Sequence, residues 1–356
     1  MKRISPSLYL WQVIVLAFLL IAVFAALNWV VDPLQFYRRA SYFPDFASQS
    51  RYQNPGLARN YPYDSIIAGT SVSLGFKHDQ IRETLGWQEL NLAMSGASAH
   101  EQSLILEVAL RTGRVRHVLW DVNHEYLRGE PDWVSDYDGA FPANFYDTNP
   151  WNEIPSYLLN VDTTKATARV LLQRAGLHLY RTRPLDDLSR LENVHPFGKE
   201  SVLQSIQRMR KMSSVFQDHP EDFAPEKLRR SFEENYLRQI REHPDVTFEL
   251  WFPPFSIARH AVLRETAPAV WDGMFHWKED VLRAITGLPN VRLHDFQGDA
   301  EVVLNLDHYM DTLHFDDAVR NRIANAVISG VSVASPESLS KTEQFLRREA
   351  AQFQTK

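Results

Sequence analysis

Short apolar segments alternate with helical patterns over much of this 356-residue chain, and that alternation limits the folds open to it. The segments that we predict as strands lie at 64–68, 88–92, 115–120, 246–252 and 291–296. The predicted helices lie at 77–85, 98–111, 225–242, 268–286 and 316–328. Strands that alternate with helices are typical of a parallel sheet covered by helices. We therefore predict an α/β fold.

The alternation is interrupted from about 125 to 223, where aromatic, acidic and irregular helical segments replace it. We interpret 125–223 as a large, mostly helical insertion within an α/β domain that spans 63–330. Residues 32–62 would form a connector in front of that domain. Residues 331–356 would form a tail helix, because Pro336 suits the first turn of a helix.

The N-terminal part carries an almost wholly apolar run, Leu8–Val31, in which Gln12 and Asn28 are the polar exceptions. About 20 such residues suffice to cross the hydrocarbon core of a bilayer. Lys2 and Arg3 precede the run, and basic residues favour the cytoplasmic side. The run therefore predicts a membrane-spanning helix whose N-terminus lies in the cytoplasm.

We accordingly assign residues 1–31 to a cytoplasmic tip and a transmembrane anchor in the inner (cytoplasmic) membrane. The rest of the chain would then face the periplasm or the cell exterior. A cleaved signal peptide is the alternative, although the apolar run is longer than a usual signal core.

The composition excludes several classes of protein and of site. There is no cysteine, which rules out disulfides, thiolate catalysis and zinc held by cysteine. The formal charge of -6 argues against a nucleic-acid partner, which would normally require a basic face. No pattern in the sequence predicts a cofactor.

Residues able to carry acyl chemistry follow four of the predicted strands. Ser71 follows the first strand, Gly96 the second and Asn123 the third, while Asp311 and His314 follow the last. Because the carboxyl ends of parallel strands form one crevice, we expect these residues to converge. His314 would remove the Ser71 proton, and Asp311 would orient the imidazole. The backbone N–H groups of Ser71 and Gly96, with the Asn123 amide, would form an oxyanion hole.

Two alternatives concern the same residues. Ser73 is a competing nucleophile, although it lies further into the loop than Ser71. A metal cluster is the second alternative, because several oxygen and nitrogen ligands lie close together in sequence. Its members would be Asp307, His308, Asp311 and His314. No second group of ligands stands out, so we predict no metal.

The ordered blocks resemble the SGNH, or GDSL-like, hydrolase superfamily, whose four blocks contribute Ser, Gly, Asn and His. The matching positions are Ser71, Gly96, Asn123 and His314. The resemblance spans about 64–130 and 245–330. It departs from the usual pattern at Thr70, where many members carry Asp, and at 121–124, which reads Asp-Val-Asn-His instead of Gly-x-Asn-Asp. The resemblance implies a three-layer, flavodoxin-like parallel sheet and a Ser-His-Asp triad.

The N-terminal anchor and the Gly-Thr-Ser block look more like the membrane-anchored branch of that superfamily. This branch includes the alginate and cellulose O-acetylation proteins and the D-alanyl transfer protein of teichoic acid synthesis. The resemblance implies transfer or hydrolysis of an acyl ester, with acetyl expected, on a cell-surface polysaccharide, often beside a multi-span membrane acyltransferase. The alternative is a non-catalytic anchored protein that uses the same fold to bind glycan or to scaffold a biosynthetic complex.

Overall fold

The structure is a computed structural model of the chain. It describes residues 6–40, 50–136, 139–147, 149, 152, 154–177, 196–212 and 214–354. Its contacts divide the chain into two compact units. The first contains residues 1–61 and 142–185, and the second contains residues 62–141 and 186–356. The segment predicted as one insertion, 125–223, is thus divided between the two units.

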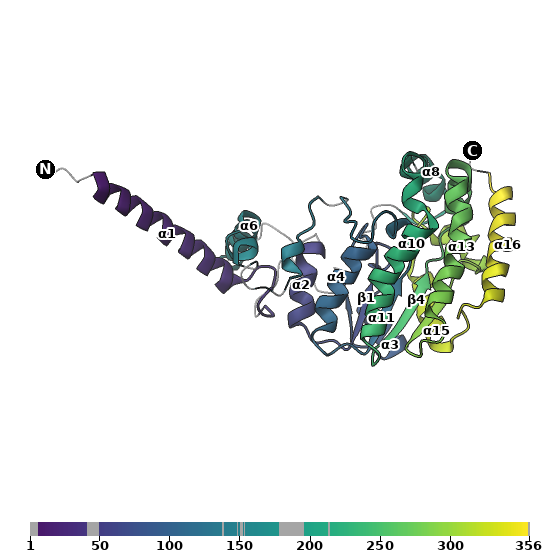
Figure 1. The fold of residues 1–356 in the computed structure, drawn as a ribbon, viewed down its shortest axis with the longest axis horizontal. Helices are drawn as coiled ribbons and strands as arrows, with labels where there is room; N and C mark the ends of the chain where they lie inside the picture. The colour runs from purple at the N-terminus through teal and green to yellow at the C-terminus, as the bar shows by residue number, and fades with distance from the viewer. Residues whose placement is uncertain are drawn as a thin grey trace. The chain divides into compact units, whose positions relative to one another are not determined.

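The second unit is built on a five-stranded, all-parallel sheet, which confirms the predicted α/β class (Figure 1). Its strands are β1 (Ser65–Ala68), β2 (Glu89–Asn91), β3 (His117–Asp121), β4 (Thr247–Phe252) and β5 (Val291–Asp295). The strand order is β2-β1-β3-β4-β5. The chain therefore runs outward from β1 to the edge strand β2 and returns to β3 on the other side of β1. In open α/β sheets a ligand crevice forms at such a reversal, outside the carboxyl ends of the strands.

The strands are apolar along most of their length because the sheet is buried on both faces. Ile66 and Ile67 of β1 and Val118 and Leu119 of β3 are all buried. The register pairs Ile67 of β1 with Leu119 of β3. This packing leaves the polar residues that follow each strand as the groups able to form a site.

The longer helices of the second unit are α3 (His78–Leu85), α4 (Ala99–Leu110), α8 (Lys199–Met212), α10 (Pro225–Phe232), α12 (Ile257–Thr266), α13 (Pro268–Ile285), α15 (Asp317–Ser329) and α16 (Pro336–Gln352). Shorter elements are η1 (His124–Tyr126), η4 (Pro220–Phe223), η5 (Glu233–Leu237), η6 (Leu306–His308), α9 (Ser214–Asp218), α11 (Arg238–Glu242) and α14 (Ala300–Val303). Local signals explain several boundaries. Ser98 and Glu101 form a capping box at α4, and Gly86, with a φ of 70°, ends α3.

Two helices differ from the sequence-based prediction. The segment predicted as a continuous helix over 225–242 is interrupted by η5, a single π-helical turn between α10 and α11. Helix α12 was not predicted at all. Its buried face includes Arg259 and His260, so no simple apolar stripe marks it in the sequence.

The first unit contains α1 (Pro6–Val31), α2 (Ser50–Asn60) and α6 (Val161–Arg174), with short turns η2 (Ala143–Phe145) and η3 (Ile154–Leu158). Helix α1 is long and apolar enough to cross a membrane, by length and composition. The segment predicted as a connector contains a helix, α2, despite Pro55 inside it. A Cβ on Gly56 would lie 2.3 Å from the Leu34 carbonyl oxygen, so glycine is needed where α2 meets residues 34–35.

Candidate active site

Three side chains of the second unit, from two segments far apart in sequence, are joined in a row by hydrogen bonds. The Ser71 Oγ lies 2.8 Å from Nε2 of His314, and Nδ1 of His314 lies 2.7 Å from Oδ2 of Asp311. The His314 side chain is 16% exposed and that of Asp311 is 24% exposed, so both are reachable from solvent. With Nδ1 protonated, the imidazole donates to Asp311 and accepts the Ser71 hydroxyl proton, as a general base requires.

The loop that carries His314 is held by hydrogen bonds between the Asp311 side chain and the loop backbone. The Oδ1 atom of Asp311 accepts the backbone N–H groups of Leu313 and His314, each at 2.8 Å. Burial alone would raise the pKa of the Asp311 carboxyl, but these hydrogen bonds and the His314 imidazole lower that pKa to about 2. Asp311 is therefore ionised at neutral pH and stabilises a protonated His314.

The turn that carries Ser71 is fixed by a buried carboxylate from the next strand of the sheet. Oδ2 of Asp121, the last residue of β3, accepts the Thr70 backbone N–H at 2.7 Å and the Ser73 hydroxyl at 2.6 Å. Gly69 is required here, because a Cβ at this position would lie 2.0 Å from the same Oδ2 atom and φ is 135°. Burial raises the pKa of the Asp121 carboxyl to about 6.

This arrangement separates the two candidate serines. Ser73 is buried, and its hydroxyl is committed to Asp121. Ser71 is partly exposed, and its hydroxyl meets His314. The contact of Thr70 with Asp121 was not foreseen from the sequence, which placed Thr70 only as a departure from the Gly-Asp-Ser pattern.

The three proposed oxyanion donors follow adjacent strands. Gly96 lies beyond β2, Ser71 beyond β1 and Asn123 beyond β3. Within the described part of the chain, the backbone N–H groups of Ser71 and Gly96 and the Asn123 side-chain amide donate to no other group. All three N–H donors are therefore free for a ligand.

Helix α12 is bonded to both loops of the site. At its start, the Ser256 hydroxyl donates to the Thr312 carbonyl oxygen at 2.9 Å, inside the loop that carries Asp311 and His314. One turn later, the buried Arg259 forms an ion pair with Glu125, two residues beyond Asn123. The sequence carried a weak signal for this helix, because Ser256 follows two prolines and suits an N-cap.

Two histidines behind the site have a different environment. His124 and His260 are both buried. In the described residues, Nε2 of His124 and both ring nitrogens of His260 have no hydrogen-bond partner. Burial, with the charges of Lys278 and Arg259, lowers the pKa of His260 to about 3, and burial lowers that of His124 to about 4. Both rings are therefore neutral at pH 7.

The residues considered as a metal cluster are engaged elsewhere. Nδ1 of His308 lies 2.9 Å from Asp316, and Asp307 accepts the Lys199 backbone N–H at 3.1 Å. Asp311 is bonded to His314. Across the described ranges, no group of three or more His, Cys, Asp or Glu side chains is arranged to hold a metal ion.

A groove of about 450 Å³ opens beside Asp311. One wall is the first half of α8, and the other is the loop at Met310 and Asp311. The lining residues are Pro196, Phe197, Gly198, Glu200, Ser201, Gln204, Ser205, Arg208, Met310 and Asp311. Its volume lies within the usual range for ligand sites. The mixture of hydroxyl, amide, charged and aromatic groups suits a ligand rich in hydroxyls.

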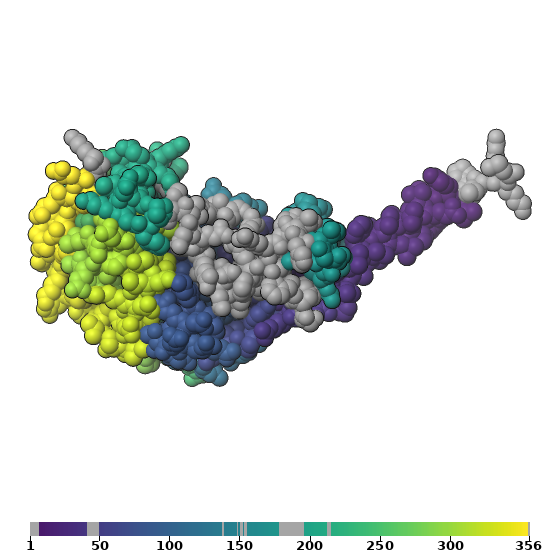
Figure 2. Space-filling view, turned by 180° about the vertical axis from the view of Figure 1, so that it is seen from behind, coloured from purple at the N-terminus to yellow at the C-terminus, as the bar shows by residue number. Residues whose placement is uncertain are grey.

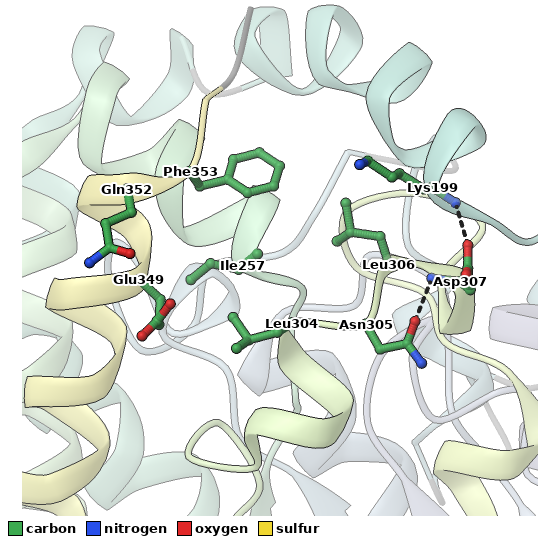
Figure 3. Close-up of a pocket in the computed structure, with 9 residues that line it drawn as sticks. All are labelled: Lys199, Ile257, Leu304, Asn305, Leu306, Asp307, Glu349, Gln352 and Phe353. Carbon is green, nitrogen blue, oxygen red and sulfur yellow. Dashed lines mark hydrogen bonds between the residues drawn. The ribbon is translucent and has the colours of Figure 1, made fainter.

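A second cavity, of about 370 Å³, lies between α16 and the turn at η6 (Figure 3). Figure 3 shows Phe353 and Gln352 on one side of it and Lys199 on the other. None of its lining residues belongs to the hydrogen-bonded set of Ser71, His314 and Asp311. Of these two cavities, the groove beside Asp311 is the one that a member of this set lines, through Asp311.

Comparison with protein-family models, with curated proteins and with solved structures gave no match. The likeness to the SGNH superfamily therefore rests on the four sequence blocks.

Proposed function

We propose that this chain is an SGNH-like serine O-acyltransferase or esterase that acts on a cell-surface polysaccharide. The observation that carries the proposal is the hydrogen-bonded line Ser71–His314–Asp311, with distances of 2.8 and 2.7 Å. A hydroxyl, an imidazole and a carboxylate in this order form the arrangement that activates serine in acyl transfer. The five-stranded parallel sheet is compatible with the layered SGNH-like fold that the sequence blocks imply.

In the first half of the reaction, Nε2 of His314 takes the proton of Ser71 as its oxygen attacks the acyl carbonyl carbon. The carbonyl oxygen becomes an oxyanion, which the free N–H groups of Ser71, Gly96 and Asn123 would bind. When the tetrahedral intermediate collapses, the bond to the alcohol of the donor breaks. His314 returns the proton to that leaving oxygen, and the acyl group stays on Ser71 as an ester.

In the second half, an acceptor hydroxyl attacks the acyl-enzyme, and His314 takes its proton. Collapse of the second intermediate returns that proton to Ser71 Oγ and releases the acylated acceptor. A sugar hydroxyl as acceptor gives transfer, whereas water gives hydrolysis. The same three residues serve both outcomes, so the acceptor site must decide between them.

We place the acceptor sugar in the groove beside Asp311, because polar side chains line the groove and Asp311 is bonded to His314. Ser201, Gln204 and Arg208 lie three or four residues apart on α8, so they share one face of the helix. Phe197 adds an aromatic surface suited to a sugar ring. An acceptor held here would compete with water for the acyl-enzyme.

We propose that α1 anchors the protein in the inner membrane, with its N-terminus in the cytoplasm and the second unit outside it. The length and apolar composition of α1 and the basic residues Lys2 and Arg3 support this topology. An acyl donor would then have to be delivered across the membrane. A multi-span membrane acyltransferase is the partner that the family resemblance suggests.

Labelling with a fluorophosphonate probe tests the catalytic proposal, because such probes react with activated serines. We expect the full-length protein and Ser73→Ala to be labelled, whereas Ser71→Ala is not. A folded wild-type protein that resists labelling would favour the non-catalytic scaffold instead. Labelling retained in Ser71→Ala would show that another residue is the nucleophile.

Two glutamines of α8 provide a matched test of the acceptor groove. Gln204 lines the groove, whereas Gln207 is exposed and does not line it. With an acetyl donor ester and cello-oligosaccharides or mannuronate oligosaccharides as acceptors, Gln204→Trp should lower transfer several-fold and leave hydrolysis of the donor unchanged. Gln207→Trp should change neither rate. Equal transfer by both variants would contradict this placement.

A further inference from the structure

The membrane-spanning candidate α1 is fastened near its end to helix α6 of the same unit. The buried amide of Asn28 donates to the Leu158 carbonyl oxygen and to the Thr164 hydroxyl, each at 2.9 Å. Its Oδ1 atom accepts the Thr167 hydroxyl at 2.7 Å. Asn28, one of the two polar residues in the apolar run, thus holds both α6 and the end of η3. Figures 1 and 2 both show α6 against the end of α1.

The attachment lies at the level where α1 would leave a bilayer. An α-helix rises about 1.5 Å per residue, so Asn28 lies about 30 Å along the helix from Leu8, the thickness of the hydrocarbon core. The next residue, Trp29, is exposed, and tryptophan is enriched where a helix crosses the membrane–water interface. Helix α6 is therefore attached at the height of the lipid headgroups.

The exposed surface of α6 is apolar on one side and charged on the other. Thr163, Thr167 and Val170 are buried. Val161 is 67% exposed, and Leu171 and Leu172 are each 41% exposed. With 100° between successive residues, Leu171 falls between Thr164 and Thr167 on the face that meets Asn28, and Val161 and Leu172 lie beside that face on the Thr164 side. The remaining arc carries Asp162, Lys165, Arg169 and Gln173.

We propose that α6 lies in the outer interface of the bilayer, with Val161, Leu171 and Leu172 among the lipid acyl chains. An amphipathic helix that lies in the interface buries its apolar face beside the headgroups and keeps its charged face in water. Helix α6 is bonded to α1, whose apolar side chains are also exposed, which is why we assign lipid as the occupant. The inference rests on the proposed membrane anchor α1 and does not depend on the chemistry at Ser71.

The charged arc is consistent with this orientation. Lys165 and Arg169 have long apolar stems, so their charged ends can reach the phosphate groups while the stems lie along the interface. Lys165 also pairs with Asp162 at 2.9 Å. Such a helix would fix the rotation of the first unit about α1, because α6 would hold one side of it against the membrane surface.

The absence of cysteine makes a direct test possible, because a single introduced cysteine can be labelled without background. Leu172→Cys and Gln173→Cys are adjacent positions on the apolar and the polar arc. Each full-length variant would carry an NBD fluorophore and be reconstituted in vesicles of phosphatidylethanolamine and phosphatidylglycerol. Spin-labelled lipids would quench those fluorophores that enter the bilayer.

We expect the label at 172 to have a blue-shifted emission and to be quenched several-fold more strongly than the label at 173. Weak quenching at 172, equal quenching at both positions, or failure of the protein to float with the vesicles would each overturn the proposal. Protection of the label at 172 in native membranes but not in pure lipid would also overturn it, and would indicate a protein partner at this face.

Discussion

Two histidines of the second unit differ in every contact of their rings. His314 is partly exposed, and its two nitrogens are bonded to Ser71 and Asp311. His260 is buried, and neither of its nitrogens has a partner among the described residues. An imidazole with one acceptor and one donor fixed on opposite sides has a defined tautomer and can move a proton. An unpartnered, buried imidazole is held neutral by the cost of charging it.

Two carboxylates, the partly exposed Asp311 and the buried Asp121, show the same contrast. The pKa of Asp311 is lowered to about 2, because His314 and two backbone N–H groups stabilise its charge against the effect of burial. The pKa of Asp121 is raised to about 6, because burial outweighs its hydrogen bonds from Ser73 and Thr70. The carboxylate with a neighbouring imidazole therefore has a lowered pKa, whereas the one that holds the turn after β1 has a raised pKa.

The largest effect is expected from Asp311→Asn, which removes the charge that orients His314. The equivalent change in a serine protease triad lowers kcat by about 10⁴, because the imidazole takes the wrong tautomer. We expect a loss of similar order in acyl-ester turnover and in fluorophosphonate labelling rate. Asp307→Asn, in the same segment but bonded to the Lys199 backbone, is the control. A variant Asp311→Asn with near-normal rates would remove Asp311 from the catalytic set.

A large loss of stability is expected from Arg259→Met. Removal of one partner of a buried ion pair costs about 3–5 kcal/mol of unfolding free energy, because Glu125 is left charged and unpaired. Arg264→Met, on an exposed position of the same helix, should cost much less. Chemical denaturation measures both. If Glu125→Gln combined with Arg259→Met is no more stable than Arg259→Met alone, the unpaired charge is not the cause.

The sequence predicted the parallel sheet because each strand is encoded locally, and it grouped Ser71 with His314 and Asp311 because these residues follow predicted strands. Each strand is a short apolar run, and Asp311 lies three residues before His314. The supports of the site were not predictable in this way. The contact of Asp121 with Ser73 joins residues 48 positions apart, and that of Glu125 with Arg259 joins residues 134 apart. Such pairs leave no periodic pattern in one sequence.

Helix α6 and its bond to Asn28 illustrate the same limit. From the sequence, Asn28 was only an exception in an apolar run, and residues 125–223 were one insertion. The partners Thr164 and Thr167 lie more than 130 positions away. A threonine inside a helix gives no sign of the distant amide that it will bind, so the division of the insertion between two units had no signal in the sequence.

A smaller effect is expected from His260→Leu, and it should depend on pH. The pKa of His260 is lowered from 6.5 to about 3, so between these values the unfolded chain binds more protons than the folded protein. The free energy of unfolding is thus unaffected by protonation of His260 well above pH 6.5, and it decreases as pH falls from 6.5 toward 3. From pH 6.5 to 5 the loss is about 2 kcal/mol.

Leucine at position 260 cannot bind a proton, so the variant should lose less stability than the wild type between pH 7 and pH 5. Urea unfolding at the two pH values measures this difference. His219→Leu, at an exposed position, is the control and should keep the wild-type pH dependence. A variant His260→Leu with an unchanged pH dependence would show that His260 reaches water in the folded protein.

The smallest effect is expected from Ser73→Ala, which removes one hydrogen bond to Asp121 and leaves the bond from Thr70. The loss should be about 1–2 kcal/mol of unfolding free energy at pH 8, where the Asp121 carboxylate needs its donors. Because the pKa of Asp121 is raised from 3.8 to about 6, the folded protein binds this proton more tightly than the unfolded chain. The stabilising effect of the protonated Asp121 on the fold is therefore fully present below pH 3.8 and is lost as pH rises through 6. Without the Ser73 donor that pKa rises further, so the variant should lose less stability at pH 5 than at pH 8.

Thermal unfolding at both pH values checks this order, with Ser71→Ala as the control that leaves Asp121 untouched. An equal loss at pH 5 and pH 8 would mean that Ser73 supports the turn by packing alone, and not by stabilising the charge of Asp121.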